Sequence, residues 1–188
     1  MPENRIIEQL RRQLPDQCVL SSIEELRPYE CDGLSAYRNL PLAVVIPETV
    51  DQVQETLRLC AENNVPVVAR GAGTGLSGGA LPVSGGVLLS MARFNRILDI
   101  DTQNRTARVQ PGVTNLSVSK AAGPHGLYYA PDPSSQLACS IGGYFAVYGV
   151  GLHCLKFGLT VHIILQLEIL SFDGEQLSMG SQAFVSPG

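Results

Sequence analysis

Apolar side chains recur at helical spacing near the start of the chain. Between residues 4 and 14 this spacing places Ile6, Ile7, Leu10 and Leu14 on one face. The stretch SSIEEL at 21–26 opens with serines and has acidic residues in the next turn, as at a capped helix start. We therefore predict two helices in this part of the chain.

A strand, a helix and a second strand are predicted in succession over residues 42–70. LAVVIP at 42–47 is a short apolar run that ends at a proline, and VPVVAR at 65–70 is a second run of strand length. Between them, Thr49 and Gln52 fit the T-x-x-Q capping-box pattern. The apolar positions that follow keep helical spacing, namely Val53, Leu57, Cys60 and Ala61. The succession is typical of a unit whose two strands run parallel.

The next segments have the pattern of shorter strands joined by a turn. GVLLSM at 86–91 and RILDID at 96–101 are apolar runs of strand length. RTARVQPG at 105–112 alternates between apolar and polar residues, and residues 101–104 provide hairpin-turn chemistry before it. We expect an antiparallel hairpin here.

The last third of the chain mixes one helix with further strands. TNLSVSKAAGPHG predicts a short helix that Thr114 opens and Gly123 closes, and LYYAPDPSS at 127–135 predicts a strand that runs into a loop. IILQLEILSFDGEQLSMG holds two strands around the turn at 173–174. The whole pattern predicts an α+β fold, with a parallel unit first and antiparallel strands later.

Composition narrows the class of protein. A chain of 188 residues with 45% hydrophobic and 16% charged residues is long and apolar enough for one globular domain. A net charge of -4 without any run of Lys or Arg argues against nucleic acid as a partner.

Cysteine usage and the N-terminus indicate where the protein works. The five cysteines are scattered, with no C-x-x-C pair, which is typical of a reducing compartment and gives no support to a metal site. The N-terminal helix has charges throughout, unlike a signal peptide, and no apolar run approaches the roughly 18 residues of a membrane span. We expect a cytoplasmic protein, with attachment to the inner membrane through partner subunits as an alternative.

The segment RGAGTGLSGGA at 70–80 is the strongest candidate for chemistry, since five of its eleven residues are glycine. Residues 73–78 fit the G-x-G-x-x-G pattern of dinucleotide-binding proteins. That motif must open a helix, yet Pro82 and the Gly85–Gly86 pair follow where the helix interior would be. A P-loop is also excluded because no Gly-Lys-Ser/Thr follows.

Two interpretations of this glycine loop remain open from its residues alone. Its successive backbone amides could form a nest for phosphate oxygens, with hydroxyl donors from Thr74 and Ser77 and a cation from Arg70. It could equally be a flexible surface turn, because short glycine motifs often occur without function.

A second motif, together with a family resemblance, favours the interpretation of the glycine loop as a phosphate-binding nest. PVVARGAGTGLSGGA, followed by APDPSSQLACSIGG at 130–143, resembles the FAD-binding domain of the vanillyl-alcohol oxidase (PCMH) type. The subgroup it resembles contains the FAD-binding subunit of bacterial glycolate oxidase and related D-lactate dehydrogenases, and LHCLKFGLTVH at 152–162 is similar to that subunit in particular. The resemblance covers roughly residues 40–180 and leaves residues 1–39 as an N-terminal helical extension before the FAD-binding domain at 40–188.

The resemblance implies two subdomains that clasp FAD between them. It places the pyrophosphate on the glycine loop, at Arg70, Gly71, Ala72, Gly73, Thr74, Gly75, Leu76, Ser77 and Gly79. It places the flavin and ribityl chain along Pro131, Asp132, Ser134, Ser135, Cys139, Ser140, Gly142 and Gly143. Some relatives attach FAD covalently through a histidine where this chain has Thr74, so non-covalent FAD is implied.

The chain departs from the family pattern in two places. Tyr144, Val147, Tyr148 and Val150 replace small and polar residues that lie beside the flavin in the family. The sequence also stops before the segment that completes the FAD-binding domain and before the substrate-binding cap, so we assign no catalytic residue.

The resemblance implies an FAD-dependent oxidoreductase subunit or fragment. Such an enzyme oxidises a small 2-hydroxy acid, for example glycolate to glyoxylate, by hydride transfer to flavin, and passes electrons to partner subunits. The alternative is a truncated, non-catalytic flavin-binding module with no turnover of its own.

Overall fold

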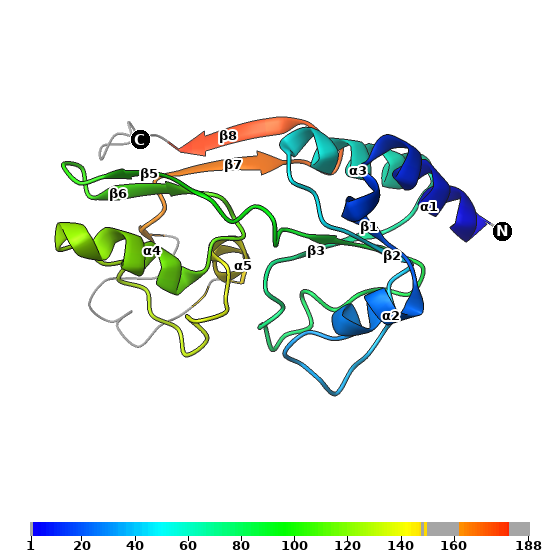
Figure 1. The fold of residues 1–188 in the computed structure, drawn as a ribbon, viewed down its shortest axis with the longest axis horizontal. Helices are drawn as coiled ribbons and strands as arrows, with labels where there is room; N and C mark the ends of the chain where they lie inside the picture. The colour runs from blue at the N-terminus through cyan, green and yellow to red at the C-terminus, as the bar shows by residue number, and fades with distance from the viewer. Residues whose placement is uncertain (1, 148, 150–161, 181–188) are drawn as a thin grey trace.

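The centre of the N-terminal lobe is a four-stranded sheet in the order β1-β2-β4-β3 (Figure 1). The structure is a computed structural model and describes residues 2–147, 149 and 162–180. The strands are β1 (Val19–Leu20), β2 (Ala43–Val45), β3 (Val67–Arg70) and β4 (Val87–Ser90). β4 pairs in parallel with both β2 and β3, and β1 pairs with β2 antiparallel. The predicted parallel pair is therefore separated by a third parallel strand, which the sequence pattern had grouped with the later strands.

Helices cover both faces of this sheet because its strand residues are apolar at successive positions. α1 (Pro2–Gln13) and α3 (Val50–Glu62) pack over one face, and the short α2 (Ile23–Leu26) packs over the other. Alternate residues of each strand point to opposite faces. The first face buries Val45 and Leu89, and the second buries Val44 and Leu88.

Side-chain caps fix where two of these helices begin. Ser22 and Glu25 form a complete capping box at the start of α2. Thr49 accepts a hydrogen bond from the Gln52 amide at the start of α3. The Gln52 side chain accepts from the Glu48 amide at 2.7 Å, one residue before the position that a capping box would use.

Residues 1–39 contribute to the same core as the residues that follow them. The side chains of Ile6 and Leu10 are fully buried in one cluster with strands β2 and β4. β1 also supplies an edge strand to the sheet. The expected N-terminal extension is thus packed into the lobe that carries the glycine loop.

The second lobe consists of a hairpin, two helices and a further hairpin that lies across the top of Figure 1. Its elements are β5 (Ile97–Asp101), β6 (Thr106–Val109), α4 (Asn115–Ala122), α5 (Ile141–Ala146), β7 (Gln166–Leu170) and β8 (Gln176–Gly180). Both strand pairs are antiparallel, as predicted. The other elements named in the described part of the chain are the short 3-10 helices η1 (Asp16–Cys18), η2 (Arg27–Tyr29) and η3 (Gly123–His125).

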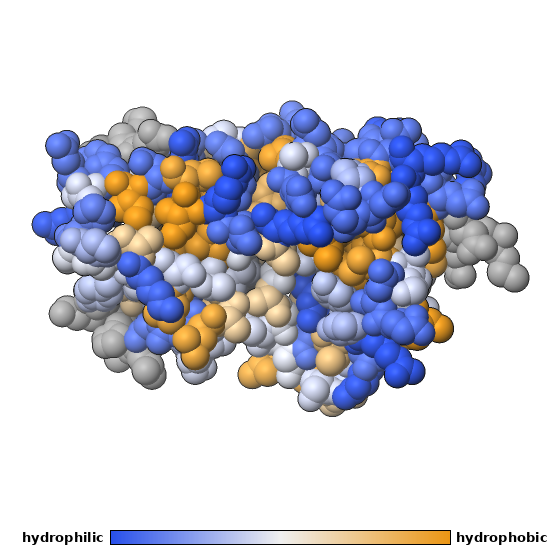
Figure 2. Space-filling view, viewed as in Figure 1, coloured by the Kyte–Doolittle hydropathy of each residue, from blue (hydrophilic) through white to orange (hydrophobic). Residues whose placement is uncertain are grey.

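The β7–β8 hairpin connects the two lobes. The Gln54 side chain on α3 donates a hydrogen bond of 2.9 Å to the Gly174 carbonyl in the hairpin turn. Leu170 packs against the core of the first lobe. In the space-filling view, an indentation separates the lobes at the lower edge of the molecule, on the side away from the hairpin (Figure 2).

Two sequence predictions in the second lobe are wrong. Residues 127–133 form no strand, and the Tyr129 amide donates instead to the Ser119 hydroxyl at 3.0 Å. Gly142 and Gly143 lie inside α5, a helix that the sequence pattern did not predict. Most of the 152–162 motif lies outside the described residues, as do Tyr148 and Val150. Within the described ranges, the structure contains no helix of the length and hydropathy that a membrane span requires.

The buried thiol of Cys60 gives a pH-dependent stability that can be measured. Burial raises the pKa of Cys60 from 9.0 to about 11. Below pH 9 the thiol is protonated in both the folded and the unfolded chain, so its contribution to stability is fully present. Between pH 9 and 11 only the unfolded chain loses the proton, so the free energy of unfolding should fall as pH rises. Chemical denaturation at pH 8 and 10.5 should show a smaller fall for Cys60→Ala than for Cys31→Ala, and equal falls would contradict the assignment.

Candidate cofactor site

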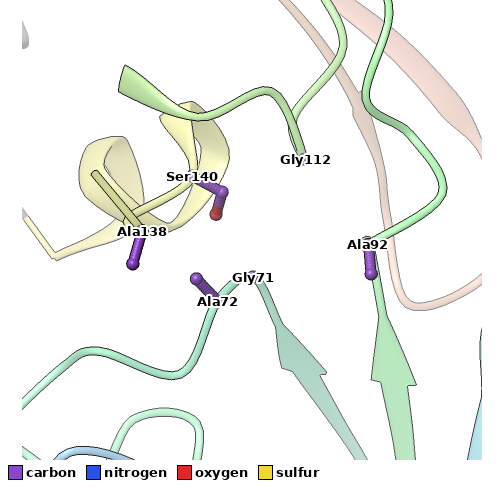
Figure 3. A pocket seen from close by; sticks show the side chains of 6 residues that line it. All are labelled: Gly71, Ala72, Ala92, Gly112, Ala138 and Ser140. Carbon is purple, nitrogen blue, oxygen red and sulfur yellow. The ribbon is translucent and has the colours of Figure 1, made fainter. Parts of the chain in front are cut away.

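A cavity of about 140 Å³ lies where the two lobes meet, beyond the carboxyl ends of β3 and β4. Because β3 and β4 are parallel neighbours with Arg70 opposite Ser90, the residues that follow each strand reach the same place. Segments of the second lobe close the opposite side, as Figure 3 shows. The lining residues are Gly71, Ala72, Ala92, Gly112, Ala138 and Ser140.

The two sequence motifs meet at this cavity through a close backbone contact. A Cβ atom on Gly71 would overlap the Ser140 hydroxyl oxygen and would lie 3.6 Å from the Gly143 Cα atom. Ser140 in turn accepts a hydrogen bond from the Gly143 amide at the start of α5. A side chain at position 71 would therefore have to displace the Ser140 hydroxyl that caps α5, and glycine lets the two lobes approach here without that change.

The second motif is held in place by the start of α4. The buried side-chain amide of Asn115 donates a hydrogen bond of 2.9 Å to the Pro131 carbonyl. The backbone N–H of Asn115 donates a second bond of 3.0 Å to the Cys139 carbonyl. The Gly142 amide donates to the Pro111 carbonyl at 2.8 Å. These bonds hold the second motif at both of its ends. The bond from the Asn115 side chain is strong because it is buried away from water.

Arg70 does not line the cavity, although the sequence placed it among the cofactor-binding residues. Its Nη1 atom donates to the Cys31 carbonyl at 2.7 Å and lies 3.5 Å from the Ala80 carbonyl. Its guanidinium carbon lies 5.7 Å from the centre of the Tyr29 ring, within cation–π range. The rest of the guanidinium occupies the space that a Cβ atom on Gly73 would need.

The other four glycines of the loop form two groups, according to whether the backbone conformation or packing of the protein explains glycine at that position. Gly73 and Gly78 have φ of +70° and +73°, which other residues rarely adopt. Gly75 and Gly79 lack a positive φ, and a Cβ atom on either would meet no atom of the described chain within 4 Å. Internal packing therefore does not explain glycine at positions 75 and 79, whereas close approach of a ligand would.

The other predicted site residues differ in exposure. Thr74 is half-buried, whereas Leu76, Ser77 and Ser134 are exposed. Residues that are partly or fully covered in the second motif are Pro131, Asp132, Ser135, Cys139 and Ser140. Burial raises the pKa of the Cys139 thiol, which a hydrogen bond to Ser135 partly offsets, so the thiol is neutral at pH 7.

The departures at the end of the second motif have different consequences. Tyr144 is buried in α5, and its ring fills the space beside the Gly149 backbone that a Cβ atom there would enter. Val147 is 56% exposed and follows the end of α5. Among the described residues, Tyr144 is buried beside Gly149 and is not one of the residues that line the cavity.

Sequence reasoning missed several residues of the site. Ala92, Gly112 and Ala138 line the cavity with little or no side chain, and such residues carry no chemical signal. Gly112 is packed against the Phe94 carbonyl, to which its amide donates at 2.7 Å. The Pro111–Gly112 pair indicates a turn and is the one signal that could have drawn attention to this segment.

Comparison with known proteins agrees with this geometry. The family described as FAD binding domain matches residues 41–180. The glycolate oxidase subunit GlcD of Escherichia coli (strain K12) is 60% identical over 179 residues, which cover 95% of this chain and 36% of that subunit. GlcD of Bacillus subtilis (strain 168) is 40% identical over 154 residues, covering 82% of this chain and 33% of the relative. The chain thus spans about a third of the length of these relatives.

A solved structure shows the same architecture. The crystal structure of p-cresol methylhydroxylase with substrate bound has a TM-score of 0.79 and 25% identity to this chain, over 95% of this chain and 35% of that one. The family match covers most of the chain and the fold is shared, and these two findings together establish the family. The chain therefore belongs to the family of FAD-binding domains of the p-cresol methylhydroxylase type, and its cofactor is FAD.

Proposed function

We propose that this chain holds FAD non-covalently between its two lobes, as the cofactor-binding part of an oxidoreductase that acts on a 2-hydroxy acid such as glycolate. The observation that carries the proposal is the contact of Gly71 with Ser140, which brings both motifs to one cavity. The pyrophosphate lies against the backbone amides of residues 71–79 in this proposal, and the ribityl chain and flavin lie along 131–143.

The cavity residues fit the phosphate part of such a cofactor. The small side chains that line the cavity leave the backbone accessible. Gly75 and Gly79 are not among the lining residues, but they leave space for a ligand to approach the rest of the loop closely. A volume of about 140 Å³ is below the roughly 300–1,000 Å³ of a complete ligand pocket, so the cavity would take only part of the dinucleotide. Amide nests bind anionic oxygens well, which favours the pyrophosphate as that part.

The residues that line the cavity could position FAD, but they could not by themselves catalyse oxidation of a 2-hydroxy acid. When bound, FAD accepts a hydride, and the protein supplies position and electrostatics. The six cavity-lining residues include no group that could take the hydroxyl proton of a 2-hydroxy acid at neutral pH. In our proposal these residues position the cofactor, and the proton acceptor lies elsewhere in the enzyme.

Relatives support the substrate class and the assembly proposed for the whole enzyme. Two relatives are named as glycolate oxidase subunits, which supports glycolate as the substrate and further subunits as partners. The alternative is a non-catalytic flavin-binding module, which is supported by the absence of an ionisable group among the six residues described as lining the cavity.

Substitution of the open glycines tests the cofactor site. Gly75→Ala and Gly79→Ala should leave the stability of the FAD-free protein nearly unchanged, because the added methyl group meets no protein atom. Each should weaken FAD binding about tenfold or more, because the methyl group displaces the phosphate from charge-assisted hydrogen bonds. Flavin fluorescence titration gives the Kd, and thermal unfolding without FAD gives the stability.

Gly123→Ala is the matched control, since a Cβ atom there also meets nothing within 4 Å. It lies at the end of α4, and both FAD affinity and stability should stay at wild-type values. Wild-type affinity in all three variants would place the pyrophosphate away from this loop. A wild-type chain that no FAD concentration saturates would contradict the proposed function itself.

Anaerobic mixing with glycolate tests whether this chain is catalytic or is a flavin-binding module without turnover. With FAD bound, we expect the flavin absorbance of this chain to stay at its oxidised value, since the cavity-lining residues lack a proton acceptor. Dithionite should bleach the same sample, which shows that the bound flavin is reducible. Bleaching by glycolate or by D-lactate above a buffer control would instead show that these residues contain a complete catalytic site.

A further inference from the structure

The segment Cys31–Leu34, which belongs to neither motif, contacts the glycine loop at three separate points. At the start of the loop, the Cys31 carbonyl accepts a hydrogen bond from Arg70. In the middle, Gly33 packs against the loop backbone, and at the end Asp32 binds Ala80. The segment follows η2 and lies beyond the region of the family resemblance, so it had no role in the sequence interpretation.

Asp32 is a buried carboxylate that uses both oxygens to join the two segments. It is 5% exposed, its Oδ1 atom accepts from the Leu34 amide at 2.9 Å, and its Oδ2 atom accepts from the Ala80 amide at 3.3 Å. A carboxylate is buried at a large cost unless its oxygens are hydrogen-bonded. The Ala80 bond therefore fixes the end of the glycine loop relative to the segment between η2 and β2.

The middle contact depends on glycine at position 33. A Cβ atom on Gly33 would lie 2.7 Å from the Gly75 carbonyl oxygen and 2.8 Å from the Thr74 carbonyl oxygen. These carbonyls are therefore held by close packing against residue 33. Since a peptide unit is planar, a fixed carbonyl also fixes the direction of the amide that follows it.

We infer that Cys31–Leu34 is a brace that holds the glycine loop in its cofactor-binding shape, with Asp32 as its positioning residue. The inference rests on the proposed binding of FAD by this loop. A loop rich in glycine loses much backbone entropy when it is ordered. If the brace orders the loop before FAD arrives, that loss is not subtracted from the binding free energy.

Asp32→Ala tests the brace through the loop itself and through the cofactor. Amide hydrogen exchange in the FAD-free protein should become about tenfold faster or more in residues 71–80, with little change in the β5–β6 hairpin. FAD affinity should fall about tenfold, because one hydrogen bond to a charged acceptor and the order it maintains are lost. Asp32→Asn keeps one acceptor oxygen and should restore part of both values.

Val53→Ala is the matched control for general destabilisation, because it removes buried volume in α3 without touching the loop. It should lower the thermal unfolding midpoint yet leave exchange in residues 71–80 and the FAD Kd near wild type. Unchanged loop exchange in both Asp32 variants would overturn the brace. Faster exchange with an unchanged Kd would overturn its role in FAD binding. If the wild type binds no FAD, the proposed function fails, while the exchange measurement still decides whether the brace exists.

Discussion

The approach of the Gly71 backbone to the Ser140 hydroxyl is the contact on which the arrangement of the two lobes depends. It brings the residue after β3 against the residue before α5, with no side chain at position 71 to separate them. Hydrogen bonds of Asn115 and Pro111 hold the second motif in place next to this contact. A cavity lined by glycine, alanine and serine results, because larger residues would fill the space that the contact creates.

The sheet topology explains why the contact forms at this place. The carboxyl ends of two parallel neighbours, β3 and β4, lie side by side, so the segments after Arg70 and Ser90 leave the sheet together. Open α/β sheets commonly bind ligands beyond such strand ends. No helix directly follows the glycine loop in the described chain, so in our proposal the backbone amides of the loop take the place of a helix N-terminus as the anion-binding element.

Local patterns predicted much of this fold, and tertiary contacts decided the rest. The periodicity of α1 and α3 and the turns of both hairpins are encoded within a few residues, and these predictions are confirmed. α5 was missed because Gly142 and Gly143 disfavour a helix, which forms here with a Ser140 cap and a bond to the Pro111 carbonyl. Of the candidate site, the glycine loop was visible in the sequence, whereas Ala92 has too small a side chain to indicate a role and Gly112 indicated only a turn.

The position of β4 between β2 and β3 also sets an order of assembly during synthesis. β2 and β3 share no hydrogen bonds with each other, so the sheet stays open until the chain has been made as far as Ser90. The loop that joins β3 to β4 is then closed at both ends while residues 131–143 have not yet emerged. One half of the cofactor clasp is therefore able to take shape first and present a surface onto which the later half docks.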